Sequence, residues 1–315
     1  MKKILRDILL VLALLLPLEL WLNAEWNQLV GHDMREYLAD LGRPAAGTRV
    51  VIFGDSHPHN AFLHTPLPDS VANVSFGSES LRDVHLKLLS LLRRGVRPTY
   101  VVVQADAHIF SPYRELTNNE QSVLPGTDVD DYNQVYGRTM SQLKKAGTSL
   151  YPLSDVQNRN LLITLLLTKY SRRAPSHTAA GQTWEQKSAE ARGRVADARL
   201  LDQFGTGTFT LSTLMRSHWQ QLLAVCRAKG IRVVAVRYPV ADEYCARLPR
   251  YDLSAVAATL RALPPDTVLD YAALYAGQNA LFQDSDHLSA AGSAQFGPRL
   301  LTDLARVAGR PIRRR

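Results

Sequence analysis

Five short runs rich in β-branched residues, separated by segments with helical spacing, limit the fold of this chain more than any other feature. The runs cover residues 49–53, 70–74, 99–103, 232–236 and 267–270. Apolar runs of this length without polar alternation are typical of strands that are buried on both faces. Strands that alternate with helices pair in parallel through right-handed crossovers. The sequence therefore predicts an α/β fold, a flavodoxin-like three-layer α/β/α arrangement around a mostly parallel five-stranded sheet.

Helices are expected between several of these runs. Apolar residues recur at helical spacing over 81–92, and a second helix is predicted at 214–229, with Gly230 as its C-cap. A third helix, at 290–307, closes the domain. The predicted order of strands and helices supports a doubly wound sheet.

A long insertion, about residues 110–213, follows the third strand. A connection of this length in a compact domain is usually functional or partly disordered. It contains the apolar segment 161–167, which we interpret first as a core helix. A lid helix over an acyl or glycan site, or a surface that rests on a membrane, are the alternatives. The insertion is therefore expected to be helical.

Two blocks of polar residues supply the parts of a serine nucleophile. Ser56 lies in a Gly-Asp-Ser-His block at the end of the first predicted strand, and Asp284 and His287 lie in a block before the last helix. A hydroxyl needs an imidazole to take its proton and a carboxylate to fix the imidazole's tautomer. An aspartate three residues before a histidine fits one turn, in which the carboxylate reaches one ring nitrogen while the other faces the serine. Ser56, His287 and Asp284 are therefore the candidate catalytic residues.

The two blocks, and their positions at the first strand and near the C-terminus, resemble the SGNH (GDSL-type) hydrolase superfamily. The later block continues from Asp284 through His287-Leu288 to Gly292, which is similar to bacterial envelope members, some of which handle O-acetyl groups on exported polysaccharides. The resemblance covers roughly residues 47–110 and 218–308. It implies a serine esterase or O-acyltransferase that acts on an acylated carbohydrate or small ester. It implies no cofactor, and envelope polysaccharide machinery is a possible partner.

The resemblance also implies two oxyanion donors, a glycine amide after the second strand and an asparagine amide after the third. Gly77 is the candidate glycine, although Asn73 or Ser75 could shift that register. After the third strand the chain reads Gln-Ala-Asp, from Gln104 to Asp106, without an asparagine. Gln104 is the amide that could substitute, while Asp106 could bind backbone amides, another side chain or substrate hydroxyls. The missing asparagine keeps a second hypothesis open, a catalytically silent binding or assembly subunit of a polysaccharide export system.

Two other chemistries have less support. Asp55-x-His57 matches the opening of two-metal phosphoesterases, and His59 and His64 follow it. The further ligand motifs of that fold, of the type Gly-Asp-x-x-Asp, Gly-Asn-His and Gly-His-x-His, are missing from the sequence. The Gly-x-Ser-x-Gly elbow of α/β-hydrolases is missing too. We therefore expect no metal site.

The N-terminus bears on where this chemistry occurs. Basic residues at positions 2, 3 and 6 precede an apolar run over 8–17 that continues to residue 22. This pattern is typical of a signal-anchor or a signal peptide in residues 1–24. We favour the uncleaved anchor because Leu22-Asn23-Ala24 is a poor cleavage site. Either reading predicts a domain over 25–308 in the cell envelope, periplasmic or otherwise extracytoplasmic, anchored in the inner membrane or secreted.

The formal net charge of +8 raises the question of a nucleic-acid partner. Part of the excess lies in a basic tail at 309–315, and neither interleaved aromatics nor a recognition helix accompanies it. We therefore expect no nucleic-acid binding, and anionic polysaccharide or phospholipid headgroups as the more natural counterparts. Cys226 and Cys245 could form one disulfide or remain free thiols.

Overall fold

The structure is a computed structural model, and it describes residues 39–118, 120–141, 182–206 and 209–309, together with isolated positions before residue 39 and residue 166. The compact unit that carries the sheet comprises Asp40–Thr139 and Gln182–Arg315. The predicted leader at 1–24 lies mostly outside the described residues, as do the tail beyond 309 and nearly all of the apolar segment 161–167. In the described part of the chain, no helix combines the length and the apolar character needed to cross a membrane.

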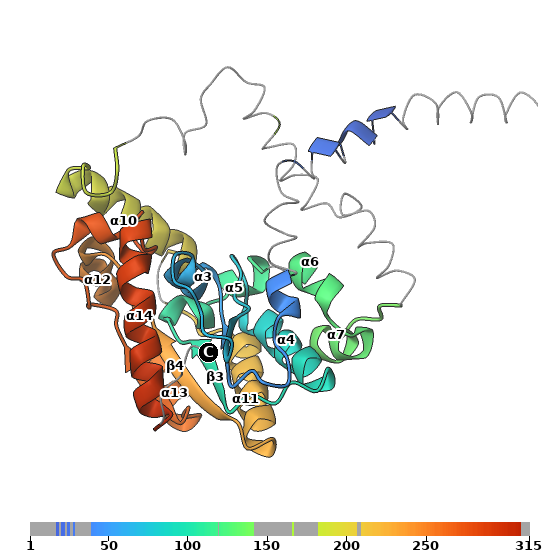
Figure 1. Ribbon diagram of the computed structural model, residues 1–315. Helices are drawn as coiled ribbons and strands as arrows, with labels where there is room; N and C mark the ends of the chain where they lie inside the picture. The colour runs from blue at the N-terminus through green and yellow to red at the C-terminus, as the bar shows by residue number, and fades with distance from the viewer. Residues whose placement is uncertain are drawn as a thin grey trace, which may run out of the picture. The chain divides into compact units, whose positions relative to one another are not determined.

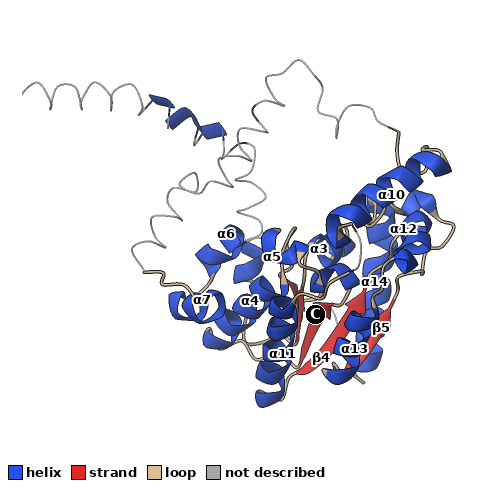
Figure 2. Ribbon diagram, turned by 180° about the vertical axis from the view of Figure 1, so that it is seen from behind, coloured by secondary structure: helices blue, strands red, loops and turns tan. Residues whose placement is uncertain are grey.

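A five-stranded, all-parallel sheet in the order β2-β1-β3-β4-β5 forms the centre of this unit (Figures 1 and 2). The strands are β1 (Val50–Phe53), β2 (Val71–Asn73), β3 (Tyr100–Gln104), β4 (Arg232–Arg237) and β5 (Thr267–Asp270). This order confirms the predicted flavodoxin-like α/β arrangement. The fifth strand has the predicted bounds, and the others begin or end within one residue of them.

The register of the central strands brings their carboxyl ends level with each other. Val50 pairs with Tyr100, and Phe53 pairs with Val103. All residues of β1 and β3 are buried because helices cover both faces, which explains why these runs are continuously apolar. The loops that leave β1 and β3 therefore emerge side by side at one edge of the sheet, where open α/β folds bind ligands.

Helices pack on both faces of the sheet (Figure 1). On one face, α3 and α14 contact each other, and side chains of α14 such as Phe296 and Leu300 join Ile52, Val102 and Val234 in one apolar cluster. On the other, α4 and α11 contact each other. These four helices are α3 (Ser56–Phe62), α4 (Leu81–Arg93), α11 (Thr213–Ala228) and α14 (Ala290–Val307).

The region after β3 is helical, as predicted. Its described elements are η1 (Ala107–Phe110), α5 (Tyr113–Leu116), α6 (Glu120–Val123), η2 (Leu124–Gly126), α7 (Val129–Tyr136) and α10 (Ala189–Phe204). The remaining elements of the unit are α12 (Asp242–Arg247), η4 (Leu248–Arg250), α13 (Ser254–Ala262) and η5 (Asn279–Leu281). Helix α10 contacts both α5 and α12. Cys226 and Cys245 are free thiols in this structure.

Gly292, in the first turn of α14, lies against the backbone of the preceding loop. A Cβ added there would be 2.1 Å from the carbonyl oxygen of Leu281 and 3.0 Å from the side chain of Leu288. The Ser289 side chain caps the helix by accepting a hydrogen bond from the Gly292 N–H, 3.2 Å away. Only glycine therefore permits this close approach of α14 to the loop that bears His287.

We predict that Gly292→Ala destabilises the protein by about 1–3 kcal/mol, because the loop or the helix must move to admit the methyl group. The measurement is the free energy of unfolding in urea. Gly47→Ala is the control, since a Cβ there would meet nothing within 4 Å. Equal stability of the two variants would contradict this account of Gly292.

A buried pair of histidines joins α4 to α11. The Nδ1 atoms of His85 and His218 lie 3.3 Å apart. Burial lowers the pKa of each imidazole to about 4, and for His218 the neighbouring His85 and Arg82 act in the same direction. Both rings are therefore neutral at pH 7, with one nitrogen donating to the other.

Because the unfolded chain takes up protons on these rings near pH 6.5 and the folded chain only near pH 4, stability is lost as the pH falls between those values. Each ring contributes up to about 1.4 kcal/mol per pH unit. We predict that the double variant His85→Gln/His218→Gln reduces the fall in the free energy of unfolding between pH 6.5 and 4, measured by urea titration at several pH values. An unchanged pH dependence would mean that these rings take up protons in the folded protein at the same pH as in the unfolded chain.

Candidate active site

Ser56 is the first residue of α3, directly after the strand–helix turn at the end of β1. Asp55 caps this helix, and its side chain accepts a hydrogen bond of 2.9 Å from the backbone N–H of His57. Gly54 makes the turn with a φ of +143°, where a Cβ would lie 2.7 Å from Pro58 and 2.9 Å from Gln104. The glycine and the capping aspartate of the motif thus hold the serine hydroxyl at the carboxyl edge of the sheet.

The loop before α14 delivers the other two predicted catalytic residues to this hydroxyl. Ser56 Oγ lies 2.8 Å from His287 Nε2. On the other side of the ring, His287 Nδ1 lies 2.9 Å and 3.0 Å from the two carboxylate oxygens of Asp284. The backbone N–H of His287 also donates to Asp284, at 2.9 Å, which closes the tight turn. When the Nδ1–H of His287 donates to Asp284, the lone pair on Nε2 faces Ser56 and can accept its proton.

The loop that carries Gly77 lies beside the loop that carries Ser56. The N–H of Phe76 donates to the carbonyl of Gly54 at 3.2 Å. Ser78 follows with a φ of +63°, the one left-handed non-glycine residue in the described part of the chain. Such a conformation costs about 1–2 kcal/mol and is characteristic of functional turns. Gly77 thus lies in a loop next to the turn that carries Ser56.

The other predicted oxyanion or substrate residues make contacts within the protein. Asn73 donates to the carbonyl of Pro58 at 3.3 Å and accepts from the N–H of Ser75 at 3.2 Å. The amide of Gln104 is buried and occupied at both ends: its oxygen accepts from the Asp55 N–H at 2.9 Å, and its nitrogen donates to Asp106 at 2.8 Å. In this arrangement Gln104 supports the serine turn rather than the open edge.

Asp106 lies in the loop after β3 and binds other groups of the protein. One carboxylate oxygen accepts from the backbone N–H of Tyr238 at 3.0 Å. The other lies 2.8 Å from Nδ1 of His57 and 2.8 Å from Nε2 of Gln104. In the structure Asp106 therefore binds a backbone amide and two side chains, which are two of the roles considered from the sequence.

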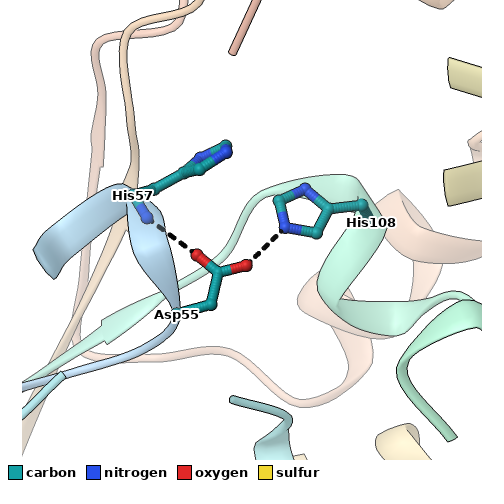
Figure 3. A group of neighbouring side chains, drawn as sticks. All are labelled: Asp55, His57 and His108. Atoms are coloured by element: carbon teal, nitrogen blue, oxygen red, sulfur yellow. Dashed lines mark hydrogen bonds and ion pairs between the residues drawn. The ribbon is translucent and has the colours of Figure 1, made fainter. Parts of the chain in front are cut away.

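Asp55 is completely buried and lies between His57, at the start of α3, and His108 in η1 (Figure 3). Its second oxygen lies 2.9 Å from His108 Nε2 and forms an ion pair with Arg114. Burial alone would raise the pKa of Asp55, but the charges of Arg114 and His57 and the contact with His108 together outweigh it and hold that pKa well below its usual range. Burial lowers the pKa of His108 to about 4, so the ring is neutral and Arg114 is the cation that balances Asp55.

Two groups of described side chains have the proximity of a metal site. In each of Asp55/His57/His108 and His57/Asp286/His287, the potential ligand atoms lie within 4.8 Å of one another. Arg114 contacts Asp55, and Arg199 Nε lies 2.7 Å from Asp286, so each carboxylate already faces a guanidinium that opposes a second cation. His59 Nδ1 lies 3.2 Å from the carbonyl of Ser75, outside both groups. We therefore interpret these clusters as hydrogen-bonded charge pairs.

Several residues around Ser56, Asp284 and His287 have no predicted role in acyl transfer. His57 and Asp286 stand inside the two motifs, next to the predicted nucleophile and base, and their position was the available signal. Arg114, Arg199 and Gln203 come from the helical region after β3, where no motif marks them.

Comparison with known proteins adds no relative: the chain matches no protein-family model, and a search of curated proteins finds none that resembles it. What is established is an α/β fold with a five-stranded parallel sheet and the side-chain geometry at its carboxyl edge. The candidate function therefore rests on this geometry and on the sequence motifs.

We predict that Arg114→Met destabilises the protein by about 3–5 kcal/mol, because it leaves the buried carboxylate of Asp55 without its cation. Arg138→Met is the matched control, since Arg138 pairs with Glu120 at 2.9 Å with its own side chain 60% exposed, and such pairs contribute at most about 1 kcal/mol. Thermal and urea unfolding of both variants would measure the difference. Similar small losses would mean that Asp55 does not depend on Arg114.

Proposed function

We propose that the protein is an SGNH-type serine esterase or O-acyltransferase that acts on acyl esters of cell-envelope or exported polysaccharide. The observation that supports this most strongly is the contact of Ser56 Oγ with His287 Nε2 at 2.8 Å, with Asp284 on the far nitrogen of the ring. These residues lie 231 positions apart in sequence, and only the fold brings them together. A nucleophile, a base and an orienting carboxylate in this geometry are suited to acyl transfer.

In the proposed reaction, Ser56 Oγ attacks the carbonyl carbon of the ester while its proton passes to His287 Nε2. The electron pair of the carbonyl double bond moves to the oxygen, which the N–H groups of Ser56 and Gly77 stabilise. As this pair returns, the bond to the alcohol oxygen breaks, and His287 gives its proton to the leaving alcohol. Water or a glycan hydroxyl then attacks the acyl-serine, with His287 again taking and returning the proton.

The proposed substrate class rests on sequence. The Gly-Asp-Ser-His block and the Asp284–Gly292 block resemble those of bacterial envelope enzymes that handle O-acetyl groups, which favours an acetyl ester on a polysaccharide. The basic residues and apolar run at the N-terminus favour an extracytoplasmic location, through a signal-anchor or a signal peptide. An excess of positive charge suits contact with anionic glycans or headgroups.

A second candidate function is a silent binding or assembly role, and one observation favours it. The loop after β3, where the superfamily places an asparagine donor, holds Asp106 in contact with His57, while the Gln104 amide is bonded to Asp55 and Asp106. Loss of one oxyanion donor typically costs about a hundred- to a thousandfold in rate. The esterase would then be slow, or the site would bind its ligand without turnover.

Hydrolysis of p-nitrophenyl acetate and labelling by a fluorophosphonate probe separate these two functions. We predict that the wild-type protein is labelled and turns over, and that Ser56→Ala loses labelling and at least about a thousandfold in kcat/KM, because the nucleophile is gone. Ser254→Ala is the matched control, since Ser254 is also the first residue of a helix, α13, but is exposed.

Equal turnover by Ser56→Ala and the wild type would contradict the proposed mechanism. A folded wild-type protein that neither turns over nor takes the label would favour the binding role. Adding an acceptor oligosaccharide to the assay then distinguishes transfer from hydrolysis, because transfer produces an acetylated acceptor.

A further inference from the structure

A second imidazole and a second carboxylate lie behind the catalytic histidine. The Asp286 carboxylate lies between two rings, with one oxygen 3.5 Å from His287 Nδ1 and the other 3.4 Å from His57 Nε2. The rings of His57 and His287 meet edge to face, with centroids 5.4 Å apart. Both Asp286 and the His57 side chain are 1% exposed, so these contacts are shielded from solvent. His287 is therefore in contact with a buried charge network that the acyl-transfer mechanism does not use.

The surroundings of His57 require it to be a cation. Its Nδ1 lies 2.8 Å from Asp106, and its Nε2 faces Asp286, so both ring nitrogens point at carboxylate oxygens. A neutral imidazole has only one N–H and would leave one of these contacts repulsive. Burial would lower the pKa of His57, but the carboxylates of Asp55 and Asp106 outweigh it and raise that pKa to about 10.

Helix α10 supplies a second cation to Asp286. Arg199 Nε donates to Asp286 at 2.7 Å, and Gln203 Nε2 donates to the same oxygen at 2.9 Å. Burial would raise the pKa of Asp286, but its hydrogen bond to His57 and the positive charges of Arg199 and His57 hold that pKa well below the usual range. Asp286 is therefore an anion, and two cations that contact the same carboxylate oxygen partly offset its charge.

This balance has a consequence for a base that must be neutral at rest. Asp284 and Asp286 place two negative charges beside Nδ1 of His287, which must be neutral to accept the proton of Ser56. The positive charges of His57 and Arg199 offset the charge of Asp286 at rest, while Asp286 still stabilises the imidazolium formed during attack. The two carboxylates thus differ. Asp284 makes the short contacts with Nδ1 of His287, whereas Asp286 lies farther away and its charge is partly offset by His57 and Arg199.

On the basis of the proposed acyl-transfer function, we propose that Asp286 is a second positioning carboxylate for His287, and that the cations His57 and Arg199 keep it from holding His287 protonated. The titratable and charged groups that face these rings come from every neighbouring element. Around His57 they are Asp55, Asp106, His108, Tyr238, Asp286 and His287, and around His287 they are Ser56, His57, Asp284 and Asp286.

The test uses substitutions that each remove one charge and should shift the pH dependence in opposite directions. Asp286→Asn removes a negative charge next to His287, so the acid limb of kcat/KM for p-nitrophenyl acetate moves to lower pH. His57→Gln removes a positive charge, so the acid limb moves to higher pH. Each shift is expected to be about one pH unit for charges at this separation in a partly screened interior. A merely structural role would lower activity in both variants without shifts of opposite sign.

Arg199→Gln is a second variant that removes a positive charge. The Arg199 side chain is 24% exposed, so its loss is less disruptive than a change at His57. It should shift the acid limb in the same direction as His57→Gln. Arg194→Gln is the matched control on the same helix, since Arg194 pairs with Glu190 in solvent, with both side chains more than half exposed. It should leave the profile unchanged.

Titration of the His287 ring by NMR, with the signal assigned by its loss in His287→Asn, gives the same answer without turnover. This readout separates failure of the inference from failure of the esterase proposal, because the ring titrates whether or not the protein hydrolyses esters. Midpoints that move in opposite directions for Asp286→Asn and for His57→Gln or Arg199→Gln support the inference. Midpoints that do not move, or that move the same way in all three variants, overturn it.

Discussion

The buried carboxylate of Asp55 is the group on which the arrangement at the edge of the sheet depends. One oxygen caps α3 and so fixes the helix turn that carries Ser56, while the other meets His108 and Arg114. Its backbone N–H is held by Gln104 at the end of β3. Because β1 and β3 end level, these contacts link the turn that carries Ser56 to the neighbouring loop directly. Without a charged partner such as Arg114, a carboxylate buried this deeply would cost several kcal/mol.

Groups of opposite charge continue from this point towards His287. His57 lies between Asp106 and Asp286, and Arg199 contacts the same oxygen of Asp286 as His57 does. Each buried anion among these groups thus has a cation or a hydrogen-bond donor, which is the condition for burying ionised groups without a large penalty. Removal of one member would leave its neighbour uncompensated, and for that reason the groups are expected to act as a unit.

The helical region after β3 supplies part of this unit. Arg114 comes from α5, and Arg199 and Gln203 come from α10. The two helices contact each other, and each places a guanidinium on a carboxylate of one of the two candidate motifs. The region that the sequence marks only as a long insertion thereby contributes to the electrostatics around the candidate triad.

The sequence predicted the strands and their order, and it marked Ser56, Asp284 and His287 as candidates that the structure brings together, because these features leave local signatures. Buried parallel strands are continuous apolar runs, and a nucleophile after a strand requires glycine and a capping residue nearby, as Gly54 and Asp55 illustrate. The contacts of Arg199 and Gln203 could not be predicted, because an arginine or glutamine on an amphipathic helix carries no sign of the partner that tertiary packing will give it. Gln104 is a candidate oxyanion donor from the sequence because its position along the strand can be predicted, but the direction of its amide cannot.

The central claim is that Ser56 is a nucleophile facing a prepared oxyanion site, and a crystal structure after reaction with a small phosphonate ester tests it most directly. We expect phosphorus bonded to Ser56 Oγ, with one phosphoryl oxygen within hydrogen-bond distance of the N–H groups of Ser56 and Gly77 and another substituent facing His287. An unmodified Ser56 after exposure to the reagent, or an adduct whose oxygen points away from Gly77, would contradict the claim.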